Sequence, residues 1–212
     1  MITIHHLGVS QSERILWLME ELGLPYELIR YDRDPVTRLA PAAYKALTPF
    51  GTAPVIDDGD LRLGESGAII EYVIFTYGDG RLAVPPSAPN YADYLFWWHF
   101  ANGSLMPAAM GGLMANMLGG GDNPVMASLV ARIDKAYAMI EDRLAQVPYF
   151  AGEELSAADL LMAFPLSTMR AFGGRDLAAY PHIRAYLQRI GSRPAYQRAM
   201  AKGDPGFQPL LA

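Results

Sequence analysis

Residues 53–66, APVIDDGDLRLGES, decide the fold expected for this chain. Pro54-Val55-Ile56 and Leu61-Arg62-Leu63 are short apolar runs on either side of the tight turn Asp57-Asp58-Gly59-Asp60, which predicts an antiparallel hairpin. Ser66 is then expected to begin a helix that runs to about Tyr77. The stretch therefore forms the closing β-β-α part of a mixed α/β arrangement.

The residues before this stretch complete the α/β arrangement. Residues 2–7 and 26–31 are predicted strands, and a helix from about Glu13 to Leu22 lies between them, with its apolar residues on one face. Gly23 and Pro25 end that helix. Such a β-α-β unit has a right-handed crossover and parallel strands. With a short helix near residues 42–47, the predicted order is β-α-β-α-β-β-α.

The residues after Tyr77 predict a linker followed by helices alone. Residues 78–90 (GDGRLAVPPSAPN) are rich in Gly and Pro and lack periodicity, which predicts a domain boundary. Helices are expected over residues 91–118 and 124–146, and from about residues 156, 181 and 193, with Gly119-Gly120-Gly121 breaking the first. The predicted domains are 1–78, a linker of 79–90, and an all-helical domain of 91–212.

Composition narrows the function. The 212 residues are 51% hydrophobic and 18% charged, with a net charge of -5 and no Lys/Arg cluster, which argues against nucleic-acid or anionic-membrane partners. The chain has no cysteine, so any thiol chemistry must use a thiol of the ligand. No signal peptide or long apolar span is visible, so a cytoplasmic protein is expected. The four histidines lack metal-ligand spacing, so no metal is expected.

Five segments, in chain order, resemble motifs of the glutathione transferase superfamily. They are Ser10-Gln11-Ser12-Glu13-Arg14, Phe50 to Ile56, Gly64-Glu65-Ser66-Gly67-Ala68-Ile69, Ser156-Ala157-Ala158-Asp159, and Pro181 to Arg198. The resemblance covers nearly the whole chain and includes the serine-type S-x-x-x-R turn. Tyr31-Asp32-Arg33-Asp34 and the first strand resemble the bacterial and fungal, yeast-type branch.

This resemblance implies a fold, a ligand and a partner. The fold would be a thioredoxin-like α/β N-terminal domain plus an all-α C-terminal domain. The ligands would be glutathione, as co-substrate, and a hydrophobic electrophile. Family members are usually homodimers, and detoxification by conjugation is the expected role, with reduction of organic hydroperoxides as a second activity. A thiol transferase mechanism would need a cysteine that this chain lacks.

Ala53-Pro54 is the first expected binding element. The resemblance implies a cis peptide bond here, which would expose the backbone of Ala53 to pair, strand-like, with the cysteinyl unit of glutathione. The alternative is an ordinary trans proline that opens an edge strand. Thr52 precedes it, at a position that is often Lys in the family.

Glu65-Ser66 is the second expected element. Ser66 suits the N-cap of the following helix. The free N–H groups and the positive end of that helix would bind the γ-glutamyl carboxylate, and Glu65 the ligand's ammonium group. The alternative role for Glu65 is a simple partner of the helix dipole.

Ser10 is the expected catalytic residue. A free thiol has a pKa of about 8.5, and a hydroxyl that donates to sulfur favours the thiolate. The alternative is a helix cap, a role that Ser12 could also take. Gln11 could reach the ligand. The sequence does not choose among Arg14, Arg38 and Lys45 as the cation for the glycyl carboxylate.

Two groups remain in the predicted helical domain. The resemblance places an electrophile pocket on the first helix after the linker, although core packing is the simpler explanation for most of these residues. The expected lining residues are Trp97, Phe100, Ala101, Leu105, Met106, Met110 and Met114. Ser156 and Asp159 form a predicted capping box with a structural role.

Two functions follow. The first is a glutathione transferase. The second is a glutathione-binding or regulatory protein that kept the fold and lost the chemistry.

Overall fold

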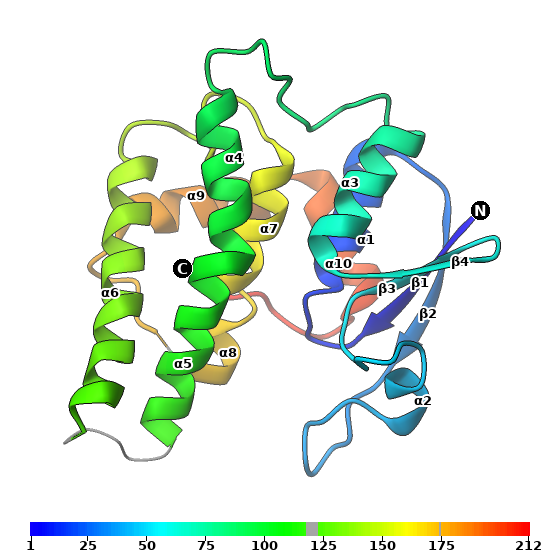
Figure 1. Cartoon of the computed structure of the whole chain (residues 1–212), viewed down its shortest axis with the longest axis horizontal. Coiled ribbons are helices and arrows are strands. Elements are labelled where there is room, and N and C mark those ends of the chain that lie inside the picture. The colour runs from blue at the N-terminus through cyan, green and yellow to red at the C-terminus, as the bar shows by residue number, and fades with distance from the viewer. Residues whose placement is uncertain (118–122, 174) are drawn as a thin grey trace. The chain divides into compact units, whose positions relative to one another are not determined.

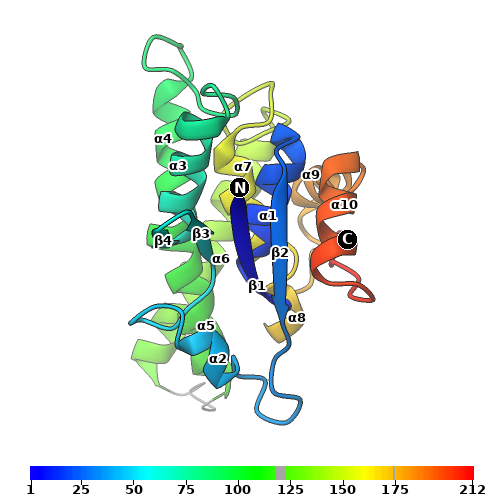
Figure 2. The same cartoon turned by 90° about the vertical axis from the view of Figure 1, so that its right-hand side faces the viewer.

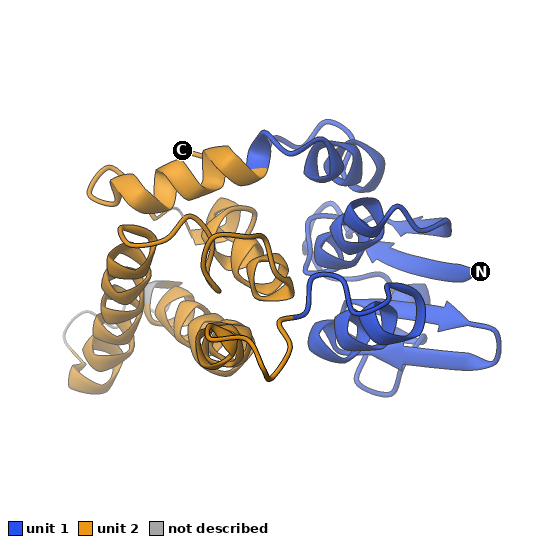
Figure 3. Ribbon diagram, turned by 90° about the horizontal axis from the view of Figure 1, so that it is seen from above, with its two compact units in different colours: residues 1–83, 191–209 blue, residues 84–190, 210–212 orange. Residues whose placement is uncertain are grey.

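The computed structural model describes residues 1–117, 123–173 and 175–212. It divides into two compact units, coloured separately in Figure 3. Unit 1 contains residues 1–83 and 191–209, and unit 2 contains residues 84–190 and 210–212. No helix within the described ranges combines the length and the apolarity needed to cross a bilayer.

Unit 1 is built on a four-stranded mixed sheet in the order β2-β1-β3-β4 (Figures 1 and 2). The strands are β1 (Ile2–Leu7), β2 (Tyr26–Tyr31), β3 (Val55–Asp58) and β4 (Leu61–Gly64). β1 and β2 are parallel, as the β-α-β pattern predicts, and β3 is antiparallel to both β1 and β4. The predicted hairpin is therefore present, with Val55 opposite Gly64.

Helices α1 (Glu13–Leu22) and α3 (Ser66–Tyr77) pack against this sheet and each other. Ile15 and Leu18 of α1 and Ile69 and Ile70 of α3 are fully buried in unit 1. The short helix α2 (Ala42–Lys45) contributes Tyr44, which packs with Leu7 and Val55 in a smaller apolar cluster. Its hydroxyl donates to the carbonyl of His5.

Helix α10 (Pro194–Gly203) packs on α1 and so belongs to unit 1. The predicted helical domain of residues 91–212 includes α10, so the prediction is wrong for this helix. Contacts between residues far apart in the sequence explain the difference. Trp17 meets Tyr196 edge to face, with 5.2 Å between ring centroids, and Glu20 pairs with Arg198 and Lys202.

In the described part of unit 2 the named elements are all helices. They are α4 (Tyr91–Phe100), η1 (Ala101–Leu105), α5 (Met106–Met117), α6 (Pro124–Leu144), α7 (Ala157–Leu166), α8 (Arg170–Gly173) and α9 (Pro181–Gly191). α7 is buried along its whole length, and it packs against α4 and η1. The rings of Trp97, Phe150 and Tyr186 form an aromatic cluster. The ring centroid of Phe150 lies 5.0 Å from that of each of the other two.

The helix predicted over residues 91–118 differs from the structure. A π-helical segment, η1, separates α4 from α5, and its sequence ANGSL contains Gly and Asn, which are weak helix formers. The helix α8 was not predicted, because four residues carry no periodicity. The predicted break at Gly119-Gly120-Gly121 lies outside the described residues.

Candidate functional site

Three segments singled out in the sequence are brought together in unit 1 by two sets of contacts. The β3–β4 pairing of Val55 with Gly64 places Ala53-Pro54 next to Glu65-Ser66. The Arg14 guanidinium, through Nη1, donates to Oγ of Ser66 at 3.0 Å and also to Oε1 of Gln11. Arg14 thus joins the Ser10 turn, residues 8–12, to the start of α3.

The Ala53–Pro54 peptide bond is cis, as predicted. Pro54 is buried, and Ala53 packs partly against the cluster of Leu7, Tyr44 and Val55. The backbone groups of Ala53 make no hydrogen bond to other residues in the described part of the chain. Thr52 is exposed. The segment therefore presents one residue with an unused backbone donor and acceptor.

The start of α3 has an unusual backbone. Glu65 is exposed and has φ 67° and ψ 117°, a conformation that is strained for any residue except glycine. The prediction of Ser66 as the N-cap is wrong by one position: Glu65 is the cap and Ser66 the first helical residue. Ser66 could not cap, because it lies inside the helix and its buried hydroxyl accepts from Arg14.

The amides of Gly67 and Ala68 lie at this helix start. The first helical hydrogen bond runs from the amide of Ile69 to the carbonyl of Glu65. Gly67 and Ala68 precede it, and their amides have no acceptor among the described residues. Unpaired amides at the positive end of a helix favour an anion.

The Ser10 turn is more closed than the sequence suggested. Ser10 is only 5% exposed. Its hydroxyl donates to the carbonyl of Leu7 at 2.7 Å and lies 2.8 Å from Oγ of Ser12. Ser12 stands at the N-cap of α1, but its side chain makes no capping bond. Its Oγ instead accepts from the amide of Leu7.

A buried aspartate and histidine support this turn, and the sequence analysis missed both roles. Nδ1 of His6 lies 2.9 Å from Oγ of Ser12, and Nε2 lies 3.1 Å from Oδ2 of Asp204. The other oxygen of Asp204 accepts from the amide of Val9 at 2.9 Å. Val9 is a β-branched residue at φ 51°, which needs such support. His6 is a strand residue, as expected, but it faces a carboxyl group that local spacing could not reveal.

The three candidate cations differ in access. Arg14 is buried, and burial lowers its pKa to about 9, which still leaves the side chain charged at neutral pH. Its guanidinium holds the site together, so it is a poor candidate for direct contact with a glycyl carboxylate. Arg38 is exposed at φ 60°, and its carbonyl accepts from Arg33. Lys45 is exposed on α2 and forms no ion pair with the described residues.

The residues expected to line an electrophile pocket fall into two groups. Trp97, Ala101 and Leu105 are 5%, 0% and 0% exposed, and η1, which carries the last two, packs against α7. Phe100 and Met106 are partly exposed, whereas Met110 and Met114 expose 41% and 46% of their surface. Only the second group offers surface to a ligand in this structure.

Ser156 and Asp159 form a capping box at the start of α7. The Asp159 carboxyl accepts from the amide of Ser156 at 2.8 Å and from its hydroxyl at 2.9 Å. It also accepts from the amide of Phe150 at 3.0 Å. Asp159 is fully buried, and burial raises its pKa to about 6 although these three donors oppose the shift. Among the described residues there is no group of three side chains suited to hold a metal.

The fold and this site define a protein with a thioredoxin-like sheet domain and a helical domain. The sheet domain presents a free backbone segment beside a helix start with two unpaired amides. Family models agree. "Glutathione S-transferase, N-terminal domain" matches residues 10–74, and "Glutathione S-transferase, C-terminal domain" matches residues 98–194.

Individual relatives span the same length. Glutathione S-transferase 3 of Schizosaccharomyces pombe is 34% identical over 100% of this chain and 92% of its own. A crystal structure of a glutathione S-transferase from Actinobacillus pleuropneumoniae is 35% identical, with a TM-score of 0.86, and covers 97% of this chain and 95% of its own. A theta class enzyme from Xanthomonas axonopodis pv. citri, solved with glutathione bound, is 26% identical, with a TM-score of 0.71, and covers 93% of this chain and 96% of its own. The chain belongs to the glutathione S-transferase family of enzymes.

Proposed function

We propose that this protein binds glutathione in unit 1, holds its thiol as the thiolate and transfers it to hydrophobic electrophiles. One observation carries the binding part. An exposed Glu65 in a strained conformation stands beside two unpaired amides at the start of α3, and the free backbone of Ala53 is next to them in the hairpin. Strained residues persist where a ligand or a tight geometry requires them.

The proposed contacts follow the chemistry of each ligand group. The γ-glutamyl carboxylate takes the amides at the start of α3, near Ser66, and the ammonium group meets the carboxylate of Glu65. The cysteinyl unit pairs with the backbone of Ala53, with Thr52 and Pro54 on either side. These contacts direct the thiol toward the Ser10 turn, where Gln11 also lies.

The thiol is activated at the Ser10 turn in this proposal. The amides of Ser10 and Gln11 have no acceptor among the described residues, and they stand at the positive end of α1. The hydroxyl of Ser10 can join them only if it leaves the carbonyl of Leu7. The thiolate then attacks the electrophilic carbon, a C–S bond forms, and the leaving group departs with its electron pair.

Glu65→Ala tests the binding site, because it removes the ammonium partner without changing buried structure. The expected result is at least tenfold weaker glutathione binding in calorimetry. The matched control is Glu27→Ala, which removes an exposed glutamate of β2 and should leave binding unchanged. Failure of the wild-type protein to bind glutathione would overturn the proposal.

Ser10→Ala tests the activating group in turnover of a chromogenic aryl halide. The buried, occupied hydroxyl predicts a loss of less than tenfold in kcat, because the amides remain. A loss of a hundredfold or more at unchanged glutathione affinity would assign activation to the hydroxyl itself. Binding without any turnover would instead favour a glutathione-binding or regulatory protein. The hydrogen bond from the Ser10 hydroxyl to Leu7 is compatible with that alternative as well.

The remaining parts of the proposal rest on the sequence and the family. The electrophile is proposed to contact the accessible members of the set given above, Phe100, Met106, Met110 and Met114. The protein is proposed to act as a cytoplasmic homodimer in detoxification, and Phe75, which is 65% exposed on α3, is a candidate for the dimer contact. Sedimentation of the wild type and of Phe75→Ser tests the dimer, which the substitution should weaken.

A further inference from the structure

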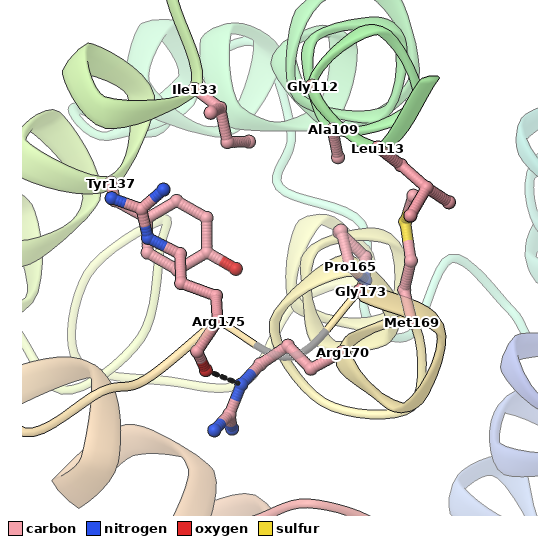
Figure 4. A pocket seen from close by; sticks show the side chains of 10 residues that line it. All are labelled: Ala109, Gly112, Leu113, Ile133, Tyr137, Pro165, Met169, Arg170, Gly173 and Arg175. Carbon is pink, nitrogen blue, oxygen red and sulfur yellow. Dashed lines mark hydrogen bonds between the residues drawn. The ribbon is translucent and has the colours of Figure 1, made fainter. Parts of the chain in front are cut away.

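Unit 2 contains a cavity of about 230 Å³, open to solvent, among α5, α6, α7 and α8 (Figure 4). Ala109 and Gly112 of α5, Ile133 and Tyr137 of α6 and Met169 before α8 are among the residues that line it. None of the seven residues expected to contact the electrophile lines this cavity. The cavity lining therefore shares no residue with the expected glutathione site or the expected electrophile pocket. All of its lining residues belong to unit 2.

Tyr137 gives this cavity a polar group. The residue is only 3% exposed, and its hydroxyl points toward the middle of the cavity in Figure 4. No hydrogen bond joins that hydroxyl to another residue that the structure describes, and its oxygen is not among the fully buried atoms that lack a partner, so solvent in the cavity can reach it. The hydroxyl is therefore free to donate to an acceptor held in the cavity, and a hydrogen bond of this kind contributes about 1 kcal/mol.

The ring of Tyr137 is held firmly. The guanidinium carbon of Arg175 lies 4.3 Å from the ring centroid, and the ring of Tyr180 meets it edge to face at 5.5 Å. Arg175 is itself fixed, because Nη2 donates to Oδ1 of Asp134 and to the hydroxyl of Tyr180. Burial raises the pKa of Tyr137, so its hydroxyl remains protonated and can donate.

The two arginines near the cavity do not favour an anion there. Asp134 offsets the charge of Arg175 at 2.6 Å. Arg170 donates to the carbonyls of Arg175, Leu210 and Ala212. Both guanidinium groups point away from the middle of the cavity in Figure 4. An anion placed beside the Tyr137 hydroxyl would lose its hydration, and the charge of Arg175 that could offset this loss is already shared with Asp134.

We propose that this cavity is a binding site for a small uncharged molecule of the size of a substituted benzene, which carries one hydrogen-bond acceptor for the hydroxyl of Tyr137. The size follows from the volume, since an apolar cavity of about 150 Å³ is enough for benzene. The preference for a partly apolar ligand follows from Ile133 and Met169, whose flexible side chain adapts to ligand shape, beside the polar side chains in the lining. Such a ligand would bind without glutathione.

The test measures the affinity of three probes for the full-length protein by calorimetry. Acetophenone carries a carbonyl acceptor, ethylbenzene has the same shape without it, and benzoate carries a charge. Acetophenone should bind at least fivefold more tightly than either of the others, the factor that one hydrogen bond of about 1 kcal/mol supplies. Benzoate binding more tightly than acetophenone would overturn the choice of an uncharged ligand.

Tyr137→Phe locates the site, because it removes the hydroxyl and keeps the ring under Arg175. Acetophenone affinity should fall about five- to tenfold and ethylbenzene affinity should not change. Tyr91→Phe on α4, outside the cavity lining, is the matched control and should change neither. Glutathione affinity should be the same in the wild type and both variants. The test of the cavity is therefore independent of the proposed transferase function.

Filling the cavity provides a second measurement. Ala109→Phe should abolish binding of acetophenone and ethylbenzene alike. If that variant does not fold, Gly112→Ala serves, because a Cβ there meets only Cγ2 of Ile133 at 3.5 Å, an ordinary contact, while it narrows the cavity. A severalfold loss of acetophenone affinity is expected. No acetophenone binding to the wild type, or equal binding to wild type, Tyr137→Phe and the filled variant, would overturn the proposal.

Discussion

Asp159 in unit 2 and Asp204 in unit 1 are both buried aspartates that fix a loop, but they find their partners at different distances along the chain. Asp159 accepts from Ser156, three residues before it, and from Phe150, nine residues before it. Asp204 accepts from Val9 and contacts His6, 195 and 198 residues away. One network is local and the other exists only in the folded protein.

A buried carboxyl can be predicted from the sequence when its hydrogen-bond partners lie within a few residues of it. Asp159 stands in a capping box whose spacing is a property of helix geometry, so the motif Ser156-x-x-Asp159 is readable. Asp204 follows the end of α10, where nothing in the local sequence indicates burial. Its role depends on α10 packing on α1, which brings it to the Ser10 turn.

Asp159→Ala should break the local network most severely. The substitution leaves the amides of Phe150 and Ser156 without their acceptor in a fully buried position. The expected loss is about 4 kcal/mol of unfolding free energy, measured by urea denaturation. Asp142→Ala, on the exposed face of α6, is the control and should change stability by less than about 0.5 kcal/mol. A similar small loss in both variants would contradict the role of Asp159.

Asp204→Ala should break the long-range network with a somewhat smaller effect, about 3 kcal/mol, because two contacts are lost instead of three. Since the Ser10 turn loses its support at Val9, glutathione affinity should fall as well. Asp204→Asn is the matched variant. Its oxygen can still accept from Val9, and its amide can donate to Nε2 of His6 once the ring proton moves to Nδ1, which then donates to Ser12, so a loss of only about 1 kcal/mol is expected. Equal losses in the two variants would show that these bonds are unimportant.

The contribution of Asp159 to the free energy of unfolding should depend on pH. Because burial raises its folded pKa to about 6, above the unfolded value, folding takes up a proton at this group. Its stabilising contribution is complete below about pH 4 and is lost as the pH rises through 6. The gap in unfolding free energy between wild type and Asp159→Asn should therefore shrink by about 2 kcal/mol from pH 4 to pH 7. A gap that stays constant would contradict the raised pKa.

Ser156→Ala should have the smallest effect. It removes the hydroxyl that donates to Asp159 but leaves the amide bond of the same residue in place. A loss of about 1 kcal/mol is expected, typical of an N-cap substitution. Thermal unfolding followed by circular dichroism measures it. A loss as large as that of Asp159→Ala would mean that the hydroxyl, and not the carboxyl, organises the start of α7.

The candidate site shows the same division. Ala53-Pro54 and the start of α3 were predicted because the hairpin and the helix that carry them are continuous in the sequence. The burial of the Ser10 hydroxyl and the bridge made by Arg14 were not predicted. Both depend on side chains from separate elements that meet only when α1 and α3 pack on the sheet.

The sequence by itself determined the order of strands and helices over residues 2–77, the parallel pairing of β1 with β2, the hairpin, the cis proline and the capping box of α7. The strands, helices and capping box follow from local spacing, and the cis proline follows from the resemblance of residues 50–56 to a family motif. Only the tertiary structure placed α10 on α1, Asp204 beneath the Ser10 turn and the hydroxyl of Tyr137 in a cavity. The physical reason is that burial and hydrogen-bond partners across many residues are set by packing, and packing leaves no periodic trace in the chain.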